Sequence, residues 1–377
     1  MSRTLVVTND FPPRNGGIES FVHSVCERLP ASNVVVYTAS MPGSASFDAA
    51  LGYDVVRDPR ATLVPTPSVA ARVVDAFNEH GCDSVLFGAA APLGLLAPGL
   101  RRAGARRIVG MTHGHEIGWA RVPGARAALR RIAAECDTLT YVSEFCRRRV
   151  APSLPADAAA RMVRVAGGVD TDVFQPDVGG AKVRAQLGIE PGRPVLVSVS
   201  RFVPRKGQDV LIRAMPRIQR AVPDAVLLLV GDGPYRRRLE AITEREGLTD
   251  CVIFTGAVPW GQAPAWFDAA DVFAMPCRTR MGGLESEALG IVFLEAQSSG
   301  LPVLVGDSGG APETVQHGRT GFVVEPTSIS SVAARAVELL GDLPTTAEMG
   351  RAGRSWVSEN WTWQGSVDTL RGLLGAT

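Results

Sequence analysis

The sequence predicts an α/β protein made of two Rossmann-like, doubly wound domains that face a central cleft. Its 377 residues exceed what one hydrophobic core usually organises. Short β-branched runs alternate with helical segments, and this alternation occurs in two successive series. A glycine-rich segment, 166–194, separates the two series. We therefore predict domains at 1–168 and 169–353, with a final helix at 354–377 that packs back on the first domain.

The first series begins with a run, "TLVVTND", that ends in a loop containing the sequence "FPPRNGGIES". A helical pattern follows through "FVHSVCERL". Further short apolar runs predict the other strands of the same sheet, and most are separated by helical segments. The strands of this first domain are expected at 4–10, 34–38, 84–90, 107–114 and 138–143.

The second series repeats the pattern and ends with a helical segment, 355–374, that no strand follows. Open α/β sheets bind ligands outside the carboxyl ends of their strands. We therefore expect the active site at these strand ends, where the two domains face each other. The strands of the second domain are expected at 193–201, 225–233, 251–256, 271–276, 303–306 and 321–326.

Composition indicates a globular cytoplasmic protein. Apolar residues make up 46% and charged residues 20% of the chain. The apolar runs are too short for a signal peptide or a membrane span. Residues 1–165 carry more basic than acidic residues, which favours anionic partners such as lipid headgroups, although ordinary solvated arginine is the alternative. The six cysteines form no C-x-x-C pair, so we expect reduced, buried thiols.

The stretch "EALGIVFLEA" places Glu287 and Glu295 at the two ends of an uncharged run. We predict a helix that begins near Gly290 and ends at Gly300, with Glu287 just before it and Glu295 one to two turns inside. A helix N-terminus binds phosphate, and carboxylates accept hydrogen bonds from sugar hydroxyls. The spacing therefore fits a nucleotide sugar, which has hydroxyls at both ends of its diphosphate. Helix capping and surface glutamates are the alternative interpretation.

Other loops after predicted strands carry candidate ligands. Arg201 and Lys206 belong to one loop and are suited to a diphosphate, unless the loop is simply solvated. Gly16 and Gly17 allow backbone to approach a ligand closely or form a plain tight turn. In "THGHE", no further ligand completes a metal site, so we interpret His115 as a single histidine facing the cleft.

Together, "NGGIES", "HGHE", "GGVDTDVFQP", "SRFVPRKGQD" and the E-x7-E stretch resemble glycosyltransferase family 4, which has the GT-B fold. The similarity covers nearly the whole chain. It is strongest to the actinobacterial branch of the family that acts on phosphatidylinositol mannosides. The resemblance implies a retaining, metal-independent enzyme without a cofactor. It would move mannose from GDP-mannose to a phosphatidylinositol mannoside, as the second, α-1,6-linked mannose, in glycolipid biosynthesis for the cell envelope.

The resemblance also implies the partners and the role of each matching position. The implied partners are a nucleotide sugar and a lipid acceptor at the inner face of the plasma membrane, with no nucleic acid. The resemblance specifies no oligomeric state. The implied catalytic residues are His115, Glu287, Arg201 and Lys206. The implied donor site adds the ribose contact Glu295, the backbone of Gly290, Ile291 and Val292, and Gly16, Gly17 and Val258. The implied acceptor side comprises Asn9, Asp10, Glu19 and His115.

The chain departs from the family pattern at several places. Glu19 and Met281 replace other residue types, and the 285–288 segment differs in its acidic arrangement. The stretch "YVSEFCRRR" also lacks the threonine that the family has near Cys146. These positions lie on the acceptor side and in the sugar pocket. A family 4 enzyme with another nucleotide sugar or another acceptor, such as a different glycolipid or a small inositol sugar, therefore stays an alternative. A catalytically silent nucleotide-sugar-binding protein is the alternative from another functional class.

Overall fold

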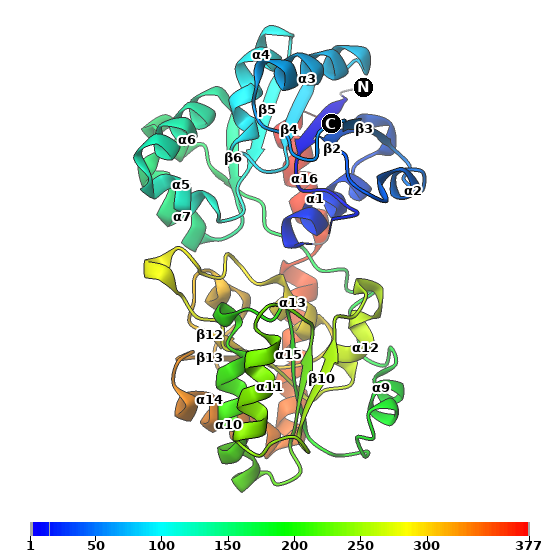
Figure 1. Cartoon of the computed structure of the whole chain (residues 1–377), viewed down its shortest axis with the longest axis vertical. Coiled ribbons are helices and arrows are strands. Elements are labelled where there is room, and N and C mark those ends of the chain that lie inside the picture. Colours follow the sequence, from blue (N-terminus) through cyan, green and yellow to red (C-terminus); the bar gives the residue numbers. More distant parts are fainter. Residues whose placement is uncertain (1–2, 15, 376–377) are drawn as a thin grey trace. The chain divides into compact units, whose positions relative to one another are not determined.

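The computed structural model describes residues 3–14 and 16–375. It divides into two compact units, which are described separately (Figure 1). Unit 1 comprises residues 1–167 and 364–377, and unit 2 comprises residues 168–363. The chain thus leaves unit 1 after Gly167 and returns to it for its final helix.

Unit 1 is built on a sheet of seven parallel strands in the order β3-β2-β1-β4-β5-β6-β7. The chain runs outward from β1 in one direction and then resumes on the other side of β1 with β4. The topological switch point of this sheet is therefore between β1 and β4. The strands are β1 (Thr4–Thr8), β2 (Val34–Ala39), β3 (Asp54–Asp58), β4 (Ser84–Phe87), β5 (Arg107–Met111), β6 (Thr138–Tyr141) and β7 (Val163–Arg164).

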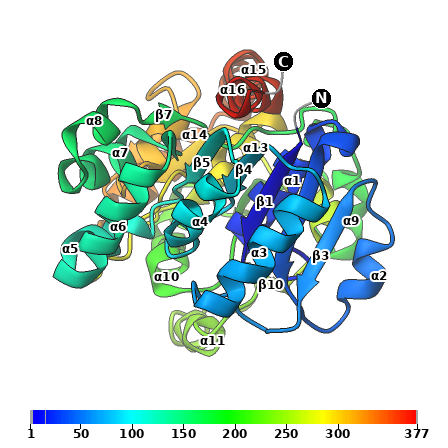
Figure 2. The same cartoon turned by 90° about the horizontal axis from the view of Figure 1, so that it is seen from above.

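Helices connect these strands, and α3 and α4 pack against each other (Figure 2). The start of α3 shows a local sequence signal, because the Thr66 side chain accepts a hydrogen bond from Val69 N and a proline occupies the first turn. The α-helices of this unit are α1 (Gly17–Arg28), α2 (Ser44–Asp48), α3 (Pro67–Glu79), α4 (Ala97–Arg102), α5 (Glu116–Arg121), α6 (Pro123–Glu135), α7 (Glu144–Val150), α8 (Ala156–Ala160) and α16 (Trp363–Leu374).

Unit 2 has six parallel strands in the order β10-β9-β8-β11-β12-β13, with its switch point between β8 and β11. The strands are β8 (Val195–Val199), β9 (Val226–Val230), β10 (Val252–Gly256), β11 (Val272–Met275), β12 (Val303–Gly306) and β13 (Gly321–Val324). The α-helices are α9 (Gly180–Gln186), α10 (Gln208–Ala221), α11 (Arg236–Arg245), α12 (Ala263–Asp268), α13 (Ile291–Ser298), α14 (Ile329–Leu340) and α15 (Leu343–Asn360).

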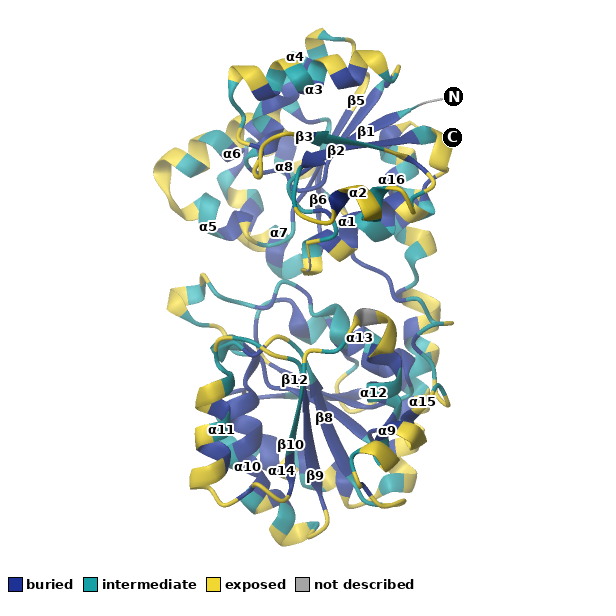
Figure 3. Ribbon diagram, turned by 45° about the vertical axis from the view of Figure 1, so that its right-hand side comes forward, coloured by how far each residue is buried: buried dark blue, intermediate teal, exposed yellow. Residues whose placement is uncertain are grey.

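The cores lie on both faces of the sheets. Every residue of β1, β2 and β9 is buried, as expected for parallel strands covered by helices on two sides. Figure 3 shows buried strands surrounded by helices whose outer faces are exposed. All six cysteines are buried free thiols, which confirms the sequence prediction.

Two strands and one boundary differ from the sequence prediction. Neither β3, "DVVRD", nor the two-residue β7 was predicted, and these are the edge strands of the first sheet. Charged or very short edge strands lack the apolar run that identifies a buried strand. The predicted single helix at 354–377 is wrong: α15 ends at Asn360 within unit 2, and only α16 belongs to unit 1. Residues 376–377 of that prediction lie outside the described residues.

Candidate functional site

Three charged side chains meet at the carboxyl edge of the second sheet, beside its switch point. Arg205 and Lys206 follow β8, and Glu287 follows β11, so neighbouring strands deliver them to one place. Glu287 Oε2 accepts hydrogen bonds from Lys206 Nζ at 2.8 Å and from Arg205 Nη1 at 2.6 Å. The side chains of Lys206 and Glu287 are each 11% exposed, while that of Arg205 is 34% exposed. The cluster therefore carries two positive charges and one negative charge.

Glu287 remains ionised despite its burial. Burial alone would raise the pKa of this carboxyl group. The charges of Lys206 and Arg205, and the hydrogen bonds that they donate, outweigh burial and hold the pKa below its ordinary value of 4.5. The carboxylate is therefore a fixed negative charge at neutral pH.

The backbone around Glu287 is held by a glycine pair after β12. Gly310 N donates to Glu287 O at 2.8 Å. Gly309 has a φ of 64°, and a Cβ at this position would lie 2.0 Å from Glu287 O. Only glycine allows this approach, so the "DSGGAPE" loop fixes the position of Glu287 from the neighbouring strand.

Two helices begin shortly after Lys206 and Glu287 in the sequence. Helix α10 starts after Gly207, with φ of 79°, and α13 starts after Gly290, with φ of 91°. Neither capping residue provides a side-chain hydrogen bond to its helix. Free N–H groups at a helix N-terminus favour phosphate. The predicted start and end of the helix in "EALGIVFLEA" are confirmed, with Glu287 before it and Glu295 at its fifth residue.

A second ion pair anchors the same loops. Arg278, after β11, donates to Asp209 on α10 at 2.8 Å and 3.2 Å, and Asp209 is buried. The backbone N–H of Arg278 also donates to Arg205 O at 2.8 Å. The β8 and β11 loops are thus tied together by side chain and backbone. Charged residues that hold loops in this way restrict the geometry of the cluster.

The other predicted donor residues of unit 2 belong to the segments that follow β8, β10 and β11. Arg201 is exposed in the loop after β8, and Glu295 is half-buried. Ile291 and Val292 form the half-buried first turn of α13, and Val258 is half-buried after β10. Sequence reasoning missed Arg205 and Arg278. Arg205 is next to Lys206 in "PRKG", and this adjacency was the available signal.

The carboxyl edge of the first sheet gathers the predicted residues of unit 1. His115 follows β5, and its Nε2 lies 3.4 Å from Ala91 O and 3.2 Å from Glu116 Oε1. Burial raises the pKa of Asp10, in the loop after β1, although the nearby charges of Arg14 and His115 act in the opposite direction. Burial likewise raises the pKa of Glu116.

His113 is a structural histidine. Its Nε2 donates to Gly88 O at 2.7 Å, and its ring packs edge-on to Phe21. Burial lowers the pKa of His113 to about 4, so the ring is neutral at neutral pH. The two histidines of "HGH" therefore differ in role: His113 holds the loop after β4, whereas His115 is exposed.

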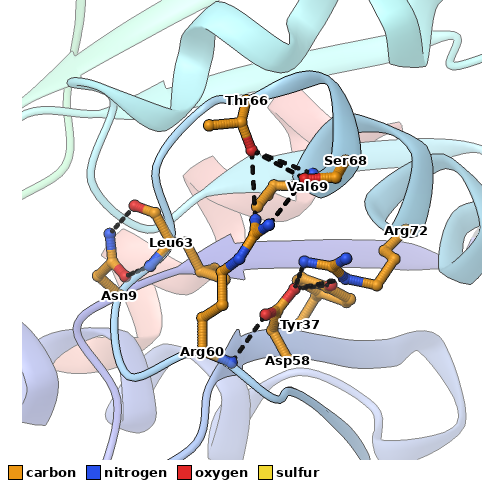
Figure 4. A network of polar contacts seen from close by, with 9 residues as sticks. All are labelled: Asn9, Tyr37, Asp58, Arg60, Leu63, Thr66, Ser68, Val69 and Arg72. Carbon is orange, nitrogen blue, oxygen red and sulfur yellow. Dashed lines mark hydrogen bonds and ion pairs between the residues drawn. The ribbon is translucent and has the colours of Figure 1, made fainter.

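Asn9 positions a loop. Its side-chain amide donates to Leu63 O at 3.0 Å, and its Oδ1 accepts from Leu63 N at 2.7 Å (Figure 4). The same loop follows Asp58, a buried carboxylate that accepts hydrogen bonds from Tyr37 Oη at 2.6 Å and Arg72 Nε at 2.8 Å. Asn9 thereby holds the segment after β3 against the loop after β1.

The remaining residues of unit 1 lie at the start of α1. Glu19 is buried and pairs with Arg14 at 3.0 Å. Gly16 and Gly17 are exposed, and a Cβ at Gly17 would meet nothing within 4 Å. Gly16 has an extended backbone, and its space is limited by the Glu19 carboxylate. Across residues 3–14 and 16–375, no group of three or more His, Cys, Asp or Glu side chains is placed to hold a metal ion.

The chain matches two family models. Residues 181–356 match "Glycosyl transferases group 1", and residues 15–173 match "Glycosyltransferase Family 4". The chain is 48% identical over 375 residues to a GDP-mannose-dependent alpha-(1-6)-phosphatidylinositol monomannoside mannosyltransferase of Mycolicibacterium smegmatis, covering 98% of this chain and 97% of that one. It is 42% identical over 376 residues to the enzyme for the monoacylated acceptor in Corynebacterium glutamicum, covering 99% and 97%.

Solved structures share the fold. The Anabaena protein Alr3699/HepE, in complex with UDP and glucose, aligns over 100% of both chains with a TM-score of 0.83 at 20% identity. This similarity establishes the GT-B architecture predicted from the sequence.

Proposed function

We propose, since this chain belongs to glycosyltransferase family 4, that it transfers mannose from GDP-mannose to a phosphatidylinositol mannoside through an α-(1-6) linkage. The observation that carries this proposal is 48% identity over nearly the full length of a relative with that activity. Family 4 enzymes retain the configuration of the transferred sugar, and the E-x7-E stretch and the basic loop of the family are present in unit 2.

The geometry of unit 2 supports a diphosphate at its sheet edge. Lys206 and Arg205 provide positive charge, and the N-termini of α10 and α13 provide free N–H groups. Arg201 is exposed on the same loop and is free to reach a ligand. We propose that Arg201 and Lys206 bind the diphosphate of the donor. A charged bidentate or paired contact of this kind also stabilises the leaving diphosphate as negative charge develops on it.

The two glutamates divide the sugar contacts of the donor. We propose that Glu287, already ionised at the sheet edge, accepts hydrogen bonds from hydroxyls of the transferred mannose. Glu295, one turn inside α13, accepts from the ribose. Carboxylates can only accept hydrogen bonds when ionised, and hydroxyls are the donors on both sugars. The backbone of Gly290, Ile291 and Val292, together with Val258, completes this donor site in unit 2. In unit 1, Gly16 and Gly17 leave the backbone open to the close approach of diphosphate or acceptor.

In unit 1, we propose that His115 lies near the reacting centre and that Asn9, Asp10 and Glu19 shape the acceptor side. Asn9 acts by holding the loop that follows β3, because both ends of its amide are committed to Leu63. In a retaining enzyme of this family, the leaving diphosphate takes the proton of the acceptor hydroxyl on the same face of the sugar. The protein then needs to orient the reactants rather than supply a base.

We propose that the enzyme works at the inner face of the plasma membrane, where its lipid acceptor lies. No helix in the described parts of the chain is long and apolar enough to cross a bilayer. Helix α6 presents Arg126, Arg130 and Arg131 to solvent, while Leu129 and Ile132 are buried in unit 1. Its apolar face is therefore used for internal packing, and its contribution to membrane binding is electrostatic.

Vesicle binding tests this placement. The triple variant Arg126→Ser, Arg130→Ser, Arg131→Ser should bind anionic vesicles more weakly than the parent, and the difference should shrink in high salt. A matched control removes three exposed arginines from α11 of unit 2, with Arg237→Ser, Arg238→Ser and Arg245→Ser. Equal loss in both variants would refute a specific role for α6, because it would report net charge alone.

A product assay tests the activity itself. GDP-, UDP- and ADP-sugars are each offered against a panel of inositol lipids that includes phosphatidylinositol monomannoside and a free inositol mannoside. The proposal requires a dimannosylated lipid from GDP-mannose. Transfer only from another nucleotide sugar, or only to another acceptor, would establish the alternative substrate. Donor binding without any transfer would establish a silent binding protein.

A further inference from the structure

Glu116 is a fully buried carboxylate that the proposed mechanism does not use. It is 0% exposed at the start of α5, directly after the candidate residue His115. Its Oε2 accepts the backbone N–H groups of His113 and Gly114, each at 3.1 Å. Gly114 has a φ of 102°, a conformation that favours glycine and folds this turn back over the carboxylate. Two such hydrogen bonds hold the carboxylate in one orientation.

The second oxygen of this carboxylate has one neighbour that can donate. Glu116 Oε1 is buried and makes no hydrogen bond in the described chain, and the imidazole nitrogen His115 Nε2 lies 3.2 Å from it. A buried carboxylate oxygen without a donor costs free energy, so the contact with the imidazole is needed to satisfy it. The need of the buried Glu116 oxygen for a donor therefore keeps the His115 imidazole close to it.

The environment of His115 Nε2 determines which ring nitrogen carries the proton. This nitrogen faces two oxygens, Glu116 Oε1 at 3.2 Å and Ala91 O at 3.4 Å. The ionised carboxylate and the carbonyl oxygen can only accept, and the carboxylate is the nearer of the two, so the proton belongs on Nε2. In the neutral ring, Nδ1 is then the acceptor. Such a nitrogen can accept a hydrogen bond from a sugar or acceptor hydroxyl.

The other charged groups around the ring do not reverse this assignment. Arg14 and His115 both lie close enough to Asp10, on the loop after β1, to oppose the rise that burial causes in the pKa of that carboxyl group. His113, on the same loop as His115, is neutral and donates its own Nε2 proton to Gly88 O. Glu116 is the group in direct contact with His115 Nε2 that is fully buried and fixed by backbone.

We propose that Glu116 is a positioning residue that keeps the His115 imidazole in its Nε2-protonated form, so that Nδ1 is available to accept a hydrogen bond from a substrate hydroxyl. The part of this inference that concerns substrate rests on the proposed function. The part that concerns the imidazole depends only on unit 1. A tautomer fixed by a buried carboxylate is a known means of presenting the correct nitrogen to a reaction.

The variant Glu116→Gln keeps the shape of the side chain, but it removes the negative charge and replaces one acceptor oxygen by an NH2 donor. The two N–H groups of His113 and Gly114 require an acceptor, so the amide oxygen of glutamine takes their position. The amide NH2 then faces His115 Nε2 and donates to it. Because this donor takes the 3.2 Å position, nearer to Nε2 than Ala91 O at 3.4 Å, the variant places the proton on Nδ1 and removes the acceptor that the substrate would use.

Nitrogen NMR of protein with 15N-labelled histidine shows which ring nitrogen of His115 carries the proton. The chain has five histidines, and a His115→Asn variant identifies the signals of His115. The measurement uses the full chain without donor or acceptor, at a pH where the rings are neutral. We expect Nε2–H in the parent and Nδ1–H in Glu116→Gln. A parent ring protonated on Nδ1, or a variant ring that stays protonated on Nε2, would overturn the proposal.

Asp58→Asn is the matched control. Asp58 is also a buried carboxylate of unit 1 that accepts a backbone N–H, from Arg60 at 3.0 Å, but it pairs with no histidine among the described residues. Both variants should lower the unfolding midpoint, because each alters a buried carboxylate. Only Glu116→Gln should change the His115 signals. A change of the same size in Asp58→Asn would show a general structural effect and refute a specific role for Glu116.

Kinetics test the link to the reaction. Glu116→Gln should lower kcat on the order of 10²-fold, because a misoriented group near a reacting centre costs about that factor. The affinity for GDP should not change. If the tautomer changes and kcat does not, the reaction does not use this ring nitrogen and the proposal fails.

If the parent transfers no mannose, the proposed function fails while the NMR result still decides the role of Glu116. If Glu116→Gln does not fold, the tautomer of the parent alone decides it.

Discussion

Replacing Glu287 by glutamine should destabilise the donor-free protein, because this residue neutralises two cations at once. Its Oε2 contacts both Lys206 Nζ and Arg205 Nη1. Glutamine preserves the shape and can still accept one hydrogen bond, but it carries no charge. Lys206, 11% exposed at its side chain, would then keep a buried charge without a counter-ion beside a second cation.

The expected loss follows from the burial of each partner. Breaking a buried ion pair costs roughly 3–5 kcal/mol, because it leaves an uncompensated charge. Arg205 is 34% exposed and can turn toward solvent, so its contact contributes less. The glutamine carbonyl also retains a hydrogen bond to one cation. We therefore expect a loss of about 2–3 kcal/mol for Glu287→Gln at neutral pH.

Urea unfolding with and without GDP measures this loss. GDP brings negative charge to the two cations, so it should stabilise Glu287→Gln at least as much as the parent. The matched control is Glu285→Gln, whose partner Arg280 lies at 3.0 Å with both side chains 39% exposed. That pair should contribute no more than about 1 kcal/mol. Equal effects of the two variants, or weaker stabilisation of Glu287→Gln by GDP, would refute the reasoning.

Three further predictions concern the donor site and one concerns the membrane. Glu295→Gln should weaken GDP and GDP-mannose equally, by roughly 1.5–3 kcal/mol in calorimetry, since both carry ribose; unequal losses would contradict a ribose contact. Lys206→Ala should weaken GDP more than guanosine, and equal losses would exclude a diphosphate role. Because the pKa of Glu287 is lowered on folding, its stabilisation is present above the unfolded value of about 4.5 and is lost as pH falls through the folded value. The stability difference between the parent and Glu287→Gln should therefore shrink in acid, and a constant difference would be the contrary result. The triple serine variant of α6 should show a smaller salt dependence of vesicle binding than the parent, and an unchanged dependence would contradict an electrostatic contact.

The sequence determined the architecture because its signals are local. Parallel strands buried on both faces require continuous apolar runs, and "AVLLLVGDG" and "RPVLVSVSR" carry them plainly. The α13 helix was located by Gly290 and Gly300, since glycine at these positions supports the backbone of a helix end. The E-x7-E spacing around that helix, together with the other motifs, was sufficient to identify the family.

Other features depended on contacts between distant segments, which no local pattern records. Edge strand β3 is visible only through its pairing with β2, because its own sequence, "DVVRD", is charged. The break between α15 and α16 divides one helical pattern between two units. The sequence spacing did not indicate that Arg205 and Lys206 would both donate hydrogen bonds to the Glu287 carboxylate.

The chemistry of individual side chains was decided by the tertiary structure. Sequence reasoning treated Glu287 as a sugar ligand, but its ion pairs with two residues about eighty positions away make it a charged anchor before any donor binds. The same holds for Glu116, which reads as an ordinary residue at the start of a helix. Only the folded chain buries its carboxylate against two backbone N–H groups and one imidazole. Sequence periodicity specifies which residues are buried, whereas the charge and proton position of a buried group depend on the atoms that the fold brings within a few ångströms of it.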